Sequence, residues 1–233
     1  MITITPLASG SRGNCYHVTD GSSPLLLEAG IPFKEIQRGI GFTTSELAGC
    51  LVSHEHQDHC KAVKDALKAG VEVWASAGTK KALQISAHNL RPMAPLINYG
   101  IGSWTVKPFE VQHDATEPLG FLLANRSKDK LLYITDSYYC RYKFLGLTHI
   151  MIECNHSYEI LRRNTEAGLL PVAMKNRLIR SHFSLENVKA FLEANDLSRV
   201  QEIWLIHLSD GNSDADQFKR EIQELTGKPV YVA

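Results

Sequence analysis

Ser53-His54-Glu55-His56-Gln57-Asp58-His59-Cys60 is the stretch that predicts both the fold and the chemistry of this chain. Three histidines and one aspartate occupy six positions directly after the apolar pair Leu51-Val52, which predicts the end of a buried strand. A tight turn there directs the first two histidines to one point, and the aspartate and third histidine to a second. Imidazoles and carboxylates are ligands that zinc and neighbouring transition metals prefer. The run predicts a metal site; a polar surface turn is disfavoured, because the chain has only 10 histidines.

Length and composition predict one ordinary globular domain covering residues 1–233. The chain is 44% hydrophobic and 21% charged, and a chain of this length can bury a substantial core. Its formal net charge is zero, so no global field draws it to nucleic acid or to an acidic membrane. A nucleic-acid substrate would therefore need a local basic patch.

Cysteine usage and the first residues predict a cytoplasmic protein. The five cysteines are odd in number and form no Cys-x-x-Cys, so we expect free thiols in a reducing compartment. Residues 1–6 lack the basic region and apolar segment of a signal peptide. No apolar run approaches the roughly 18 residues of a membrane span, so no membrane partner is expected. The sequence predicts no particular oligomeric state.

Strand and helix patterns alternate up to about residue 90, which predicts a layered α/β fold. The predicted strands are residues 2–5, 15–19, 25–30, 51–52, 71–74, 104–106, 109–112, 119–124, 131–134, 150–152, 203–206 and 229–232. The predicted helices are 33–40, 61–68, 79–88, one from 158, one capped by Ser184 and running to about 194, and one that starts at a capping box over 213–216 and ends at Gly227. The Gly/Ser loop over 8–14 lacks the lysine of a P-loop and predicts a simple tight turn.

Three later residues repeat the arrangement of a ligand-type side chain directly after an apolar strand: His113, Asp136 and His207. Each alone is more often a polar strand end, but their recurrence in one context favours convergence at one rim of a sheet. Seven candidate ligand residues suffice for two ions. The predicted sets are His54, His56 and His113 for one ion and Asp58, His59 and His207 for the other, with Asp136 able to bridge them.

The order of these motifs resembles the metallo-β-lactamase superfamily over essentially the whole chain, with Glu28 as the acidic residue after the third strand. Flanking motifs at 8–14, 113–118, 153–156, 181–184 and 207–209 are similar to the small bacterial YycJ/WalJ branch, which is exonuclease-like and related to tRNase Z and RNase J. The resemblance implies an α/β (α+β) fold, a four-layer αβ/βα metallo-β-lactamase-like sandwich. It also implies a binuclear hydrolytic site with two divalent ions, zinc being expected and manganese the alternative.

Two positions depart from the superfamily pattern. The usual residue at the position of Glu28 is aspartate. The carboxylate that supports the histidine run is therefore expected to be displaced by one methylene. After His59, the common Ile-Gly-Gly type of sequence is replaced by Cys60-Lys61-Ala62. Cys60 is expected to be a packed thiol at a helix start, with an additional soft ligand as the alternative. Neither departure removes a predicted metal ligand.

The resemblance to tRNase Z also implies two catalytic residues. His182 matches a histidine that protonates the leaving group, and Glu153 matches the glutamate that orients it. An imidazole held by a carboxylate is a sound proton donor near neutral pH. The alternative for His182 is a capping or core role before the helix at Ser184. His156 is a weaker candidate for lining the pocket.

The predicted substrate is a phosphodiester, and nucleic acid is favoured over a free nucleotide. Two metal ions with a metal-bound hydroxide as nucleophile suit phosphodiesters, but also lactams, lactones and thioesters. Residues 162–180 hold five basic residues against Glu166 alone, a local net charge of 5 − 1 = +4; a solvated helix face is the alternative. The chain lacks an RNase J-type insertion and a tRNA-gripping arm, which favours DNA ends or short nucleic acids. The other hypotheses are a small-molecule metallohydrolase (cyclic nucleotide phosphodiesterase or lactonase) and a non-catalytic metal-binding protein.

Overall fold

The computed structural model describes residues 1–233, and the chain forms two compact units. The first unit comprises Met1–Glu110 and Ala115–Asp129, and the second comprises Val111–Asp114 and Lys130–Ala233. The prediction that the chain is one domain stays a prediction. All five cysteines are buried and free of disulfides, as expected. None of the helices has the length and apolar character needed to cross a membrane.

The first unit contains nine strands and four α-helices. Its strands are β1 (Thr3–Ala8), β2 (Cys15–Thr19), β3 (Leu25–Leu27), β4 (Gly49–Leu51), β5 (Val73–Ser76), β6 (Leu90–Met93), β7 (Tyr99–Ile101), β8 (Trp104–Glu110) and β9 (Leu119–Ala124). Its helices are α1 (Phe33–Gly39), α2 (Gln57–Cys60), α3 (Val63–Lys68) and α4 (Ala77–Leu83), with the 3-10 turn η1 (Thr44–Glu46) before β4.

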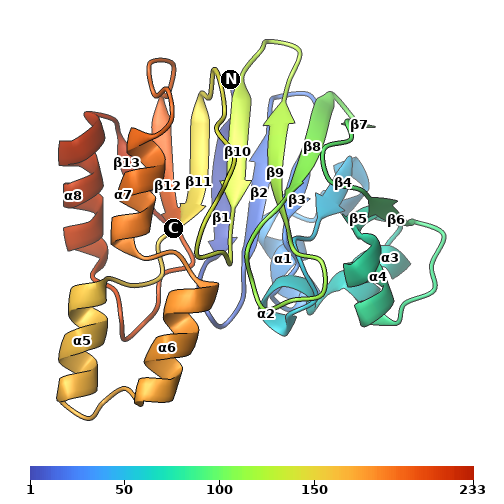
Figure 1. The fold of residues 1–233 in the computed structure, drawn as a ribbon. Helices are drawn as coiled ribbons and strands as arrows, with labels where there is room; N and C mark the ends of the chain where they lie inside the picture. Colours follow the sequence, from blue (N-terminus) through green and yellow to red (C-terminus); the bar gives the residue numbers. More distant parts are fainter. The chain divides into compact units, whose positions relative to one another are not determined.

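Strands β1 to β6 form one sheet in sequence order, antiparallel from β1 to β3 and parallel from β3 to β6 (Figure 1). The central strands β3 and β4 are wholly buried, which explains why they read as continuous apolar runs. Helix α3 packs Val63 and Ala66 into the same apolar cluster as Leu26 and Val52. This core fixes the end of β4, and the histidine run follows directly from it.

Strands β7, β8 and β9 form an antiparallel meander, and here one prediction is wrong. Residues 104–106 and 109–112 were predicted as separate strands, but Trp104–Glu110 is the single strand β8. Pro108 is tolerated within it because pairing with β7 stops at Val106, so no β7 carbonyl requires a proline N–H. Two short strands, β6 and β7, were not predicted. Pro92 lies in β6 at the edge of its sheet, where a missing N–H does little harm.

The second unit contains the parallel strands β10 (Lys130–Ile134), β11 (His149–Glu153), β12 (Glu202–Ile206) and β13 (Val230–Val232). Its helices are α5 (Tyr158–Glu166), α6 (Val172–Ser181), α7 (Leu185–Glu193) and α8 (Ala215–Thr226). In Figure 1, α7 and α8 lie side by side and α8 contacts β13, while α5 and α6 form a helical hairpin.

Helix ends in the second unit largely follow the predictions. The Ser184 hydroxyl accepts the Asn187 N–H and caps α7, and Gly227 ends α8 in the left-handed conformation at φ 64°. The predicted capping box at the start of α8 is wrong, because Asp214, not Ser213, caps the helix by accepting the Gln217 N–H. Helix α6, which begins after Pro171, was not predicted.

Candidate metal and catalytic site

The histidine run leaves the buried end of β4 and enters α2, which brings its four predicted ligands together within the first unit. The His54 Nε2 and His56 Nδ1 atoms lie 3.1 Å apart, and the His54 and His59 ring centroids are 4.2 Å apart. Asp58 Oδ2 lies 3.3 Å from His59 Nε2. Ser53 Oγ, 2.8 Å from His54 Nδ1, orients the first imidazole. Ring nitrogens that face each other at this distance are a donor set suited to a metal ion.

The Gly/Ser loop over 8–14 supports this run, a role beyond the tight turn that was predicted. Asn14 donates its backbone N–H to the Asp58 carbonyl at 2.7 Å, and its Nδ2 lies 3.3 Å from His59 Nε2. Gly30 approaches the same segment so closely that a Cβ there would lie 1.7 Å from the Asp58 carbonyl oxygen. The position of the run therefore depends on residues that only the tertiary structure brings near it.

Glu28 also supports the run despite its extra methylene. Its wholly buried carboxylate accepts the Ser53 N–H at 3.2 and 3.3 Å, and Oε2 lies 3.6 Å from His59 Nδ1. Glu28 has φ 67°, a left-handed backbone that non-glycine residues rarely adopt. Cys60 is a packed thiol, as expected: it is buried, its Sγ donates to the Glu55 carbonyl, and burial, followed by the Glu28 charge, raises its pKa to about 11.

In the second unit, Asp136 and His207 leave β10 and β12 with left-handed backbones, at φ 42° and φ 52°. These two residues and Glu28 thus share an unfavourable backbone conformation at a strand exit, a feature that clusters at functional sites. His207 Nδ1 hydrogen-bonds Asp136 Oδ1, and the Thr135 hydroxyl donates to the same oxygen at 2.9 Å. Asp136 is consequently held in one orientation by neighbours on two sides.

His113 has the hydrogen bonding of a metal ligand. Its Nδ1 donates to the Ser181 carbonyl at 2.8 Å, which leaves Nε2 as an unprotonated lone pair. Nε2 lies 3.3 Å from Asp136 Oδ2 and also 3.3 Å from Asp114 Oδ1. Burial lowers the pKa of His113 against the opposing effect of Asp136, so the ring is neutral near pH 7. A lone pair facing two carboxylate oxygens is an arrangement that a bound cation would stabilise.

His182 and Glu153 form the predicted pair. His182 Nδ1 lies 2.6 Å from Glu153 Oε1, and Glu153 Oε2 accepts the N–H groups of Ser137 and Phe183 at 3.0 and 3.1 Å. Burial lowers the pKa of His182, but the Glu153 charge and hydrogen bond outweigh it and raise the pKa to about 9. One ligand atom from each of four residues lies within 4.8 Å of the others: Asp136, Glu153, His182 and His207.

Asn155 and His156 carry buried polar atoms; of the two, the sequence indicated a role only for His156, as a weaker candidate for lining the pocket. Both His156 ring nitrogens and Asn155 Oδ1 are buried without a hydrogen-bond partner. Burial, followed by the nearby charge of His182, lowers the pKa of His156 to about 4, so the ring is neutral. The Asn155 Nδ2 group donates to the His207 carbonyl at 3.1 Å. Only the interactions within the folded unit distinguish these residues from ordinary core positions.

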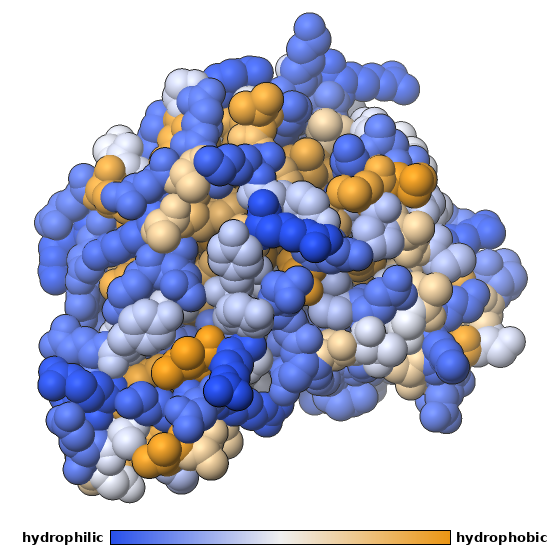
Figure 2. Space-filling model, viewed as in Figure 1, coloured by the Kyte–Doolittle hydropathy of each residue, from blue (hydrophilic) through white to orange (hydrophobic).

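The predicted basic segment forms the hairpin of α5 and α6. Arg177 pairs with Asp114 at 3.0 Å, and Arg162 contacts Glu166 at 3.9 Å. The remaining cations of the segment, Arg163, Lys175 and Arg180, form no salt bridge. Figure 2 shows hydrophilic and hydrophobic side chains interleaved over this hairpin, where Leu169 and Val172 are 77% and 61% exposed. The hairpin thus presents a mixed basic and apolar surface.

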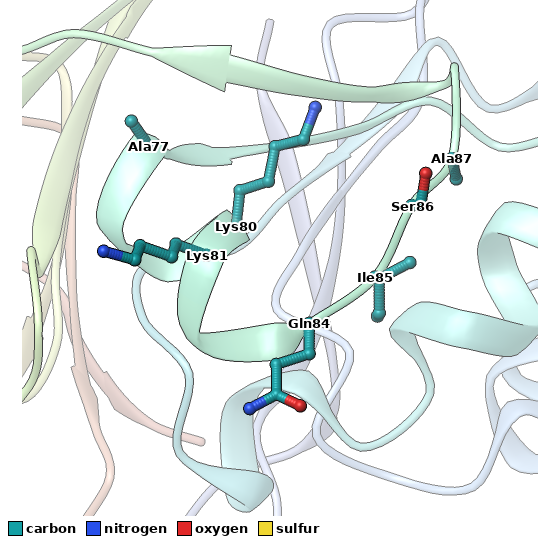
Figure 3. A pocket seen from close by; sticks show the side chains of 7 residues that line it. All are labelled: Ala77, Lys80, Lys81, Gln84, Ile85, Ser86 and Ala87. Atoms are coloured by element: carbon teal, nitrogen blue, oxygen red, sulfur yellow. The ribbon is translucent and has the colours of Figure 1, made fainter.

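A separate hollow of about 480 Å³ lies along α4 in the first unit (Figure 3). Its two lysines, Lys80 and Lys81, point in different directions, and Lys80 donates to the Leu90 carbonyl at 2.9 Å. None of the predicted metal ligands lines it. Because its charges do not converge, this hollow has none of the features of the predicted site.

Comparison with known proteins identifies the family. The model described as "Beta-lactamase superfamily domain" matches residues 34–207. The chain is 28% identical to exodeoxyribonuclease YycJ of Bacillus anthracis, covering 94% of this chain and 87% of the relative. It is 29% identical to exodeoxyribonuclease WalJ of Streptococcus pneumoniae, covering 89% and 81%. The metallo-β-lactamase fold protein YhfI from Bacillus subtilis superimposes with a TM-score of 0.76 at 15% identity, covering 100% of this chain and 96% of that one. The chain therefore belongs to the metallo-β-lactamase superfamily of metal-dependent hydrolases, and its fold is the one that the sequence predicts.

Proposed function

We propose that the protein is a metal-dependent phosphodiesterase that degrades DNA, with the character of an exonuclease. The observation that carries the proposal is the grouping of a half-buried proton donor, His182 on the buried Glu153, with Asp136 and His207 in one cluster. A hydrolase of phosphodiesters needs a proton for the departing oxygen as well as metal ligands. Two relatives that align over most of this chain are named exodeoxyribonucleases, which supports the choice of DNA.

We further propose that the seven predicted ligands hold two divalent ions, with zinc expected because imidazoles dominate the set. One ion would take His54, His56 and His113, the other would take Asp58, His59 and His207, and Asp136 would be shared. When bound, two such ions acidify water and stabilise the charge that develops on the phosphate. The neutral lone pair of His113 and the close contact of His54 with His56 both fit this role.

The chain's own residues would then supply the proton that the departing oxygen needs. Glu153 accepts the Nδ1–H of His182 and keeps the imidazole protonated, which leaves the Nε2–H to be given to the departing oxygen. Because Glu153 also accepts the Ser137 and Phe183 N–H groups, its carboxylate cannot turn away from the histidine. The pair is therefore rigid before any substrate binds.

The α5–α6 hairpin supports a polyanionic substrate. Arg163, Lys175 and Arg180 are cations without salt-bridge partners in a protein of zero net charge, and such groups bind phosphates by releasing counterions. Arg177 is already neutralised by Asp114 at 3.0 Å, so we expect it to contribute less. A lactone or β-lactam would gain nothing from this surface.

The proposal is tested by incubating the purified, zinc- or manganese-loaded protein with end-labelled single- and double-stranded DNA. A cyclic nucleotide, a lactone and a generic phosphodiester serve as parallel substrates. We expect shortening of DNA from an end, abolished by a chelator and restored by the metal. The matched variants are His182→Ala, which should cleave DNA roughly 10²–10⁴-fold more slowly, and His88→Ala, an exposed histidine outside the site, which should cleave it as the wild type does. Turnover of the cyclic nucleotide or lactone without DNA cleavage would assign the protein to small-molecule hydrolysis instead.

A further inference from the structure

The loop that follows Asp136 has an unusual composition. Residues 138–143 read Tyr-Tyr-Cys-Arg-Tyr-Lys, with three tyrosines and two cations in six positions. Tyr138 and Tyr139 are 37% and 56% exposed, and the Arg141 guanidinium carbon lies 5.1 Å from the centroid of the Tyr142 ring. Interleaved aromatic and cationic side chains are typical of surfaces that bind single-stranded nucleic acid.

This loop and α7 enclose a cavity of about 210 Å³, which we call the loop pocket. Its lining consists of Tyr139, Cys140, Arg141, Tyr142, Lys143, Phe183, Asn187, Ala190, Phe191, Ala194 and Asn195. The Phe183 and Phe191 rings lie 6.4 Å apart, so part of the wall is aromatic. The cavity is smaller than the roughly 300–1,000 Å³ of a drug-sized site, and it suits one planar ring system.

Two asparagines fix the loop against the opposite wall, Asn187 in α7 and Asn195 just beyond its C-terminal end. Asn187 Nδ2 donates to the Tyr138 carbonyl at 3.0 Å, and Asn195 Oδ1 accepts the Phe144 N–H at 2.8 Å. The loop is thus tied at both ends to the opposite wall. A cavity fixed in this way needs little reorganisation to accept a ligand.

The loop pocket adjoins the proton donor within the same unit. Its loop begins two residues after Asp136, and Phe183 in its wall follows His182 directly. Glu153 Oε2 accepts both the Phe183 N–H and the N–H of Ser137, which precedes the loop. The wall of the pocket and the pair proposed to protonate the departing oxygen are therefore linked through the hydrogen bonds of one carboxylate.

We propose that the loop pocket binds the unpaired nucleobase next to the scissile phosphodiester, on the leaving-group side; this rests on the proposed function. The exposed Tyr139 ring would stack on the base, while Arg141 and Lys143, both exposed at the pocket, would contact the flanking phosphates. A paired base cannot enter, because it would have to leave the helix stack. The protein therefore prefers single-stranded or frayed ends that carry a base.

The test compares metal-loaded wild-type protein with two pocket variants, Tyr139→Ala and Ala190→Leu, the second of which fills the cavity from an exposed position on α7. The substrates are single-stranded oligonucleotides that end in a normal or an abasic nucleotide. We expect wild-type KM to be about 5- to 150-fold lower for the normal end, the effect of one base stack at about 1–3 kcal/mol. Both variants should lose that preference. Tyr231→Ala, a surface tyrosine on β13 outside the pocket, should keep it.

Two results would overturn the proposal separately from each other. If the wild-type protein cleaves normal and abasic ends with equal KM, or if both pocket variants keep the preference, the pocket does not bind a base although DNA is still the substrate. If no DNA is cleaved at all while a small molecule is hydrolysed, the proposed function fails and the pocket assignment fails with it. Thermal unfolding of each variant separates a local effect from loss of the fold.

Discussion

His182→Ala is the substitution that most directly tests the chemistry of the second unit. The imidazole sits 2.6 Å from the buried Glu153 carboxylate, which raises the pKa of His182 to about 9 despite burial. The ring is therefore almost fully protonated near neutral pH and ready to donate. A positioned acid contributes roughly 10²–10⁴-fold in rate, or about 3–5 kcal/mol of transition-state stabilisation. We expect a loss in that range on DNA, whose departing oxygen needs a proton.

The assay compares two leaving groups at constant metal content. Nitrophenolate departs without a proton, so hydrolysis of a bis(nitrophenyl) phosphate should fall far less than DNA cleavage in the same variant. Elemental analysis should show wild-type metal in His182→Ala, because the proposal does not use this residue as a ligand. Equal losses on both substrates would refute the role of acid and leave His182 as a positioning or packing residue.

A companion substitution, Glu153→Gln, separates the charge from the hydrogen bond. The carboxylate is what raises the pKa of His182 against burial, so its removal lowers that pKa. An acid works only while protonated, so wild-type activity on DNA should extend to about pH 9 and the variant should lose activity at lower pH. An unchanged alkaline limit in the pH–rate profile would contradict this reasoning.

Three further predictions concern binding, acid stability and backbone packing. Arg180→Ala should raise KM for DNA and reduce the salt slope by about one, whereas Arg177→Ala, whose charge is paired, should do so less; equal effects in kinetics at varied salt would contradict this. Because the pKa of His156 is lowered to about 4 in the fold, the unfolded chain binds the proton first, and the free energy of unfolding should fall by about 3 kcal/mol as the pH drops from 6.5 toward about 4. His156→Gln should lack that dependence in urea unfolding curves recorded across this range. Gly30→Ala should lower the free energy of unfolding by about 1–3 kcal/mol or more, because its Cβ would collide with the Asp58 carbonyl. A variant that unfolds at the same urea concentration as the wild type would disprove the contact.

The parts of the fold that depend on local signals were predictable from the sequence. A ligand-type residue after an apolar run predicts the end of a strand. His113, Asp136 and His207 do follow the ends of strands, within three residues of β8, β10 and β12. The Ser184 cap and the Gly227 stop follow from the same side-chain and backbone rules in any protein. Such signals lie within a few residues of the feature that they specify.

What the sequence could not reveal depends on contacts between distant segments. Asn14 meets Asp58 only once β2 and β4 lie in one sheet, and the need for glycine at position 30 arises from that same approach. Pro108 stays within β8 because β7 is short, which no local pattern records. The buried, unpartnered nitrogens of His156 are visible only when the surrounding side chains are in place.

The central claim is that seven residues hold two divalent ions, and metal stoichiometry tests it most directly. The protein would be purified without chelator and its zinc and manganese measured per chain by elemental analysis, beside Asp58→Ala and His207→Ala. We expect close to two equivalents in the wild-type protein and about one in each variant, because each substitution removes a ligand of the same ion. A reproducible maximum of one equivalent in the wild-type protein, with neither variant losing any of it, would contradict the binuclear site.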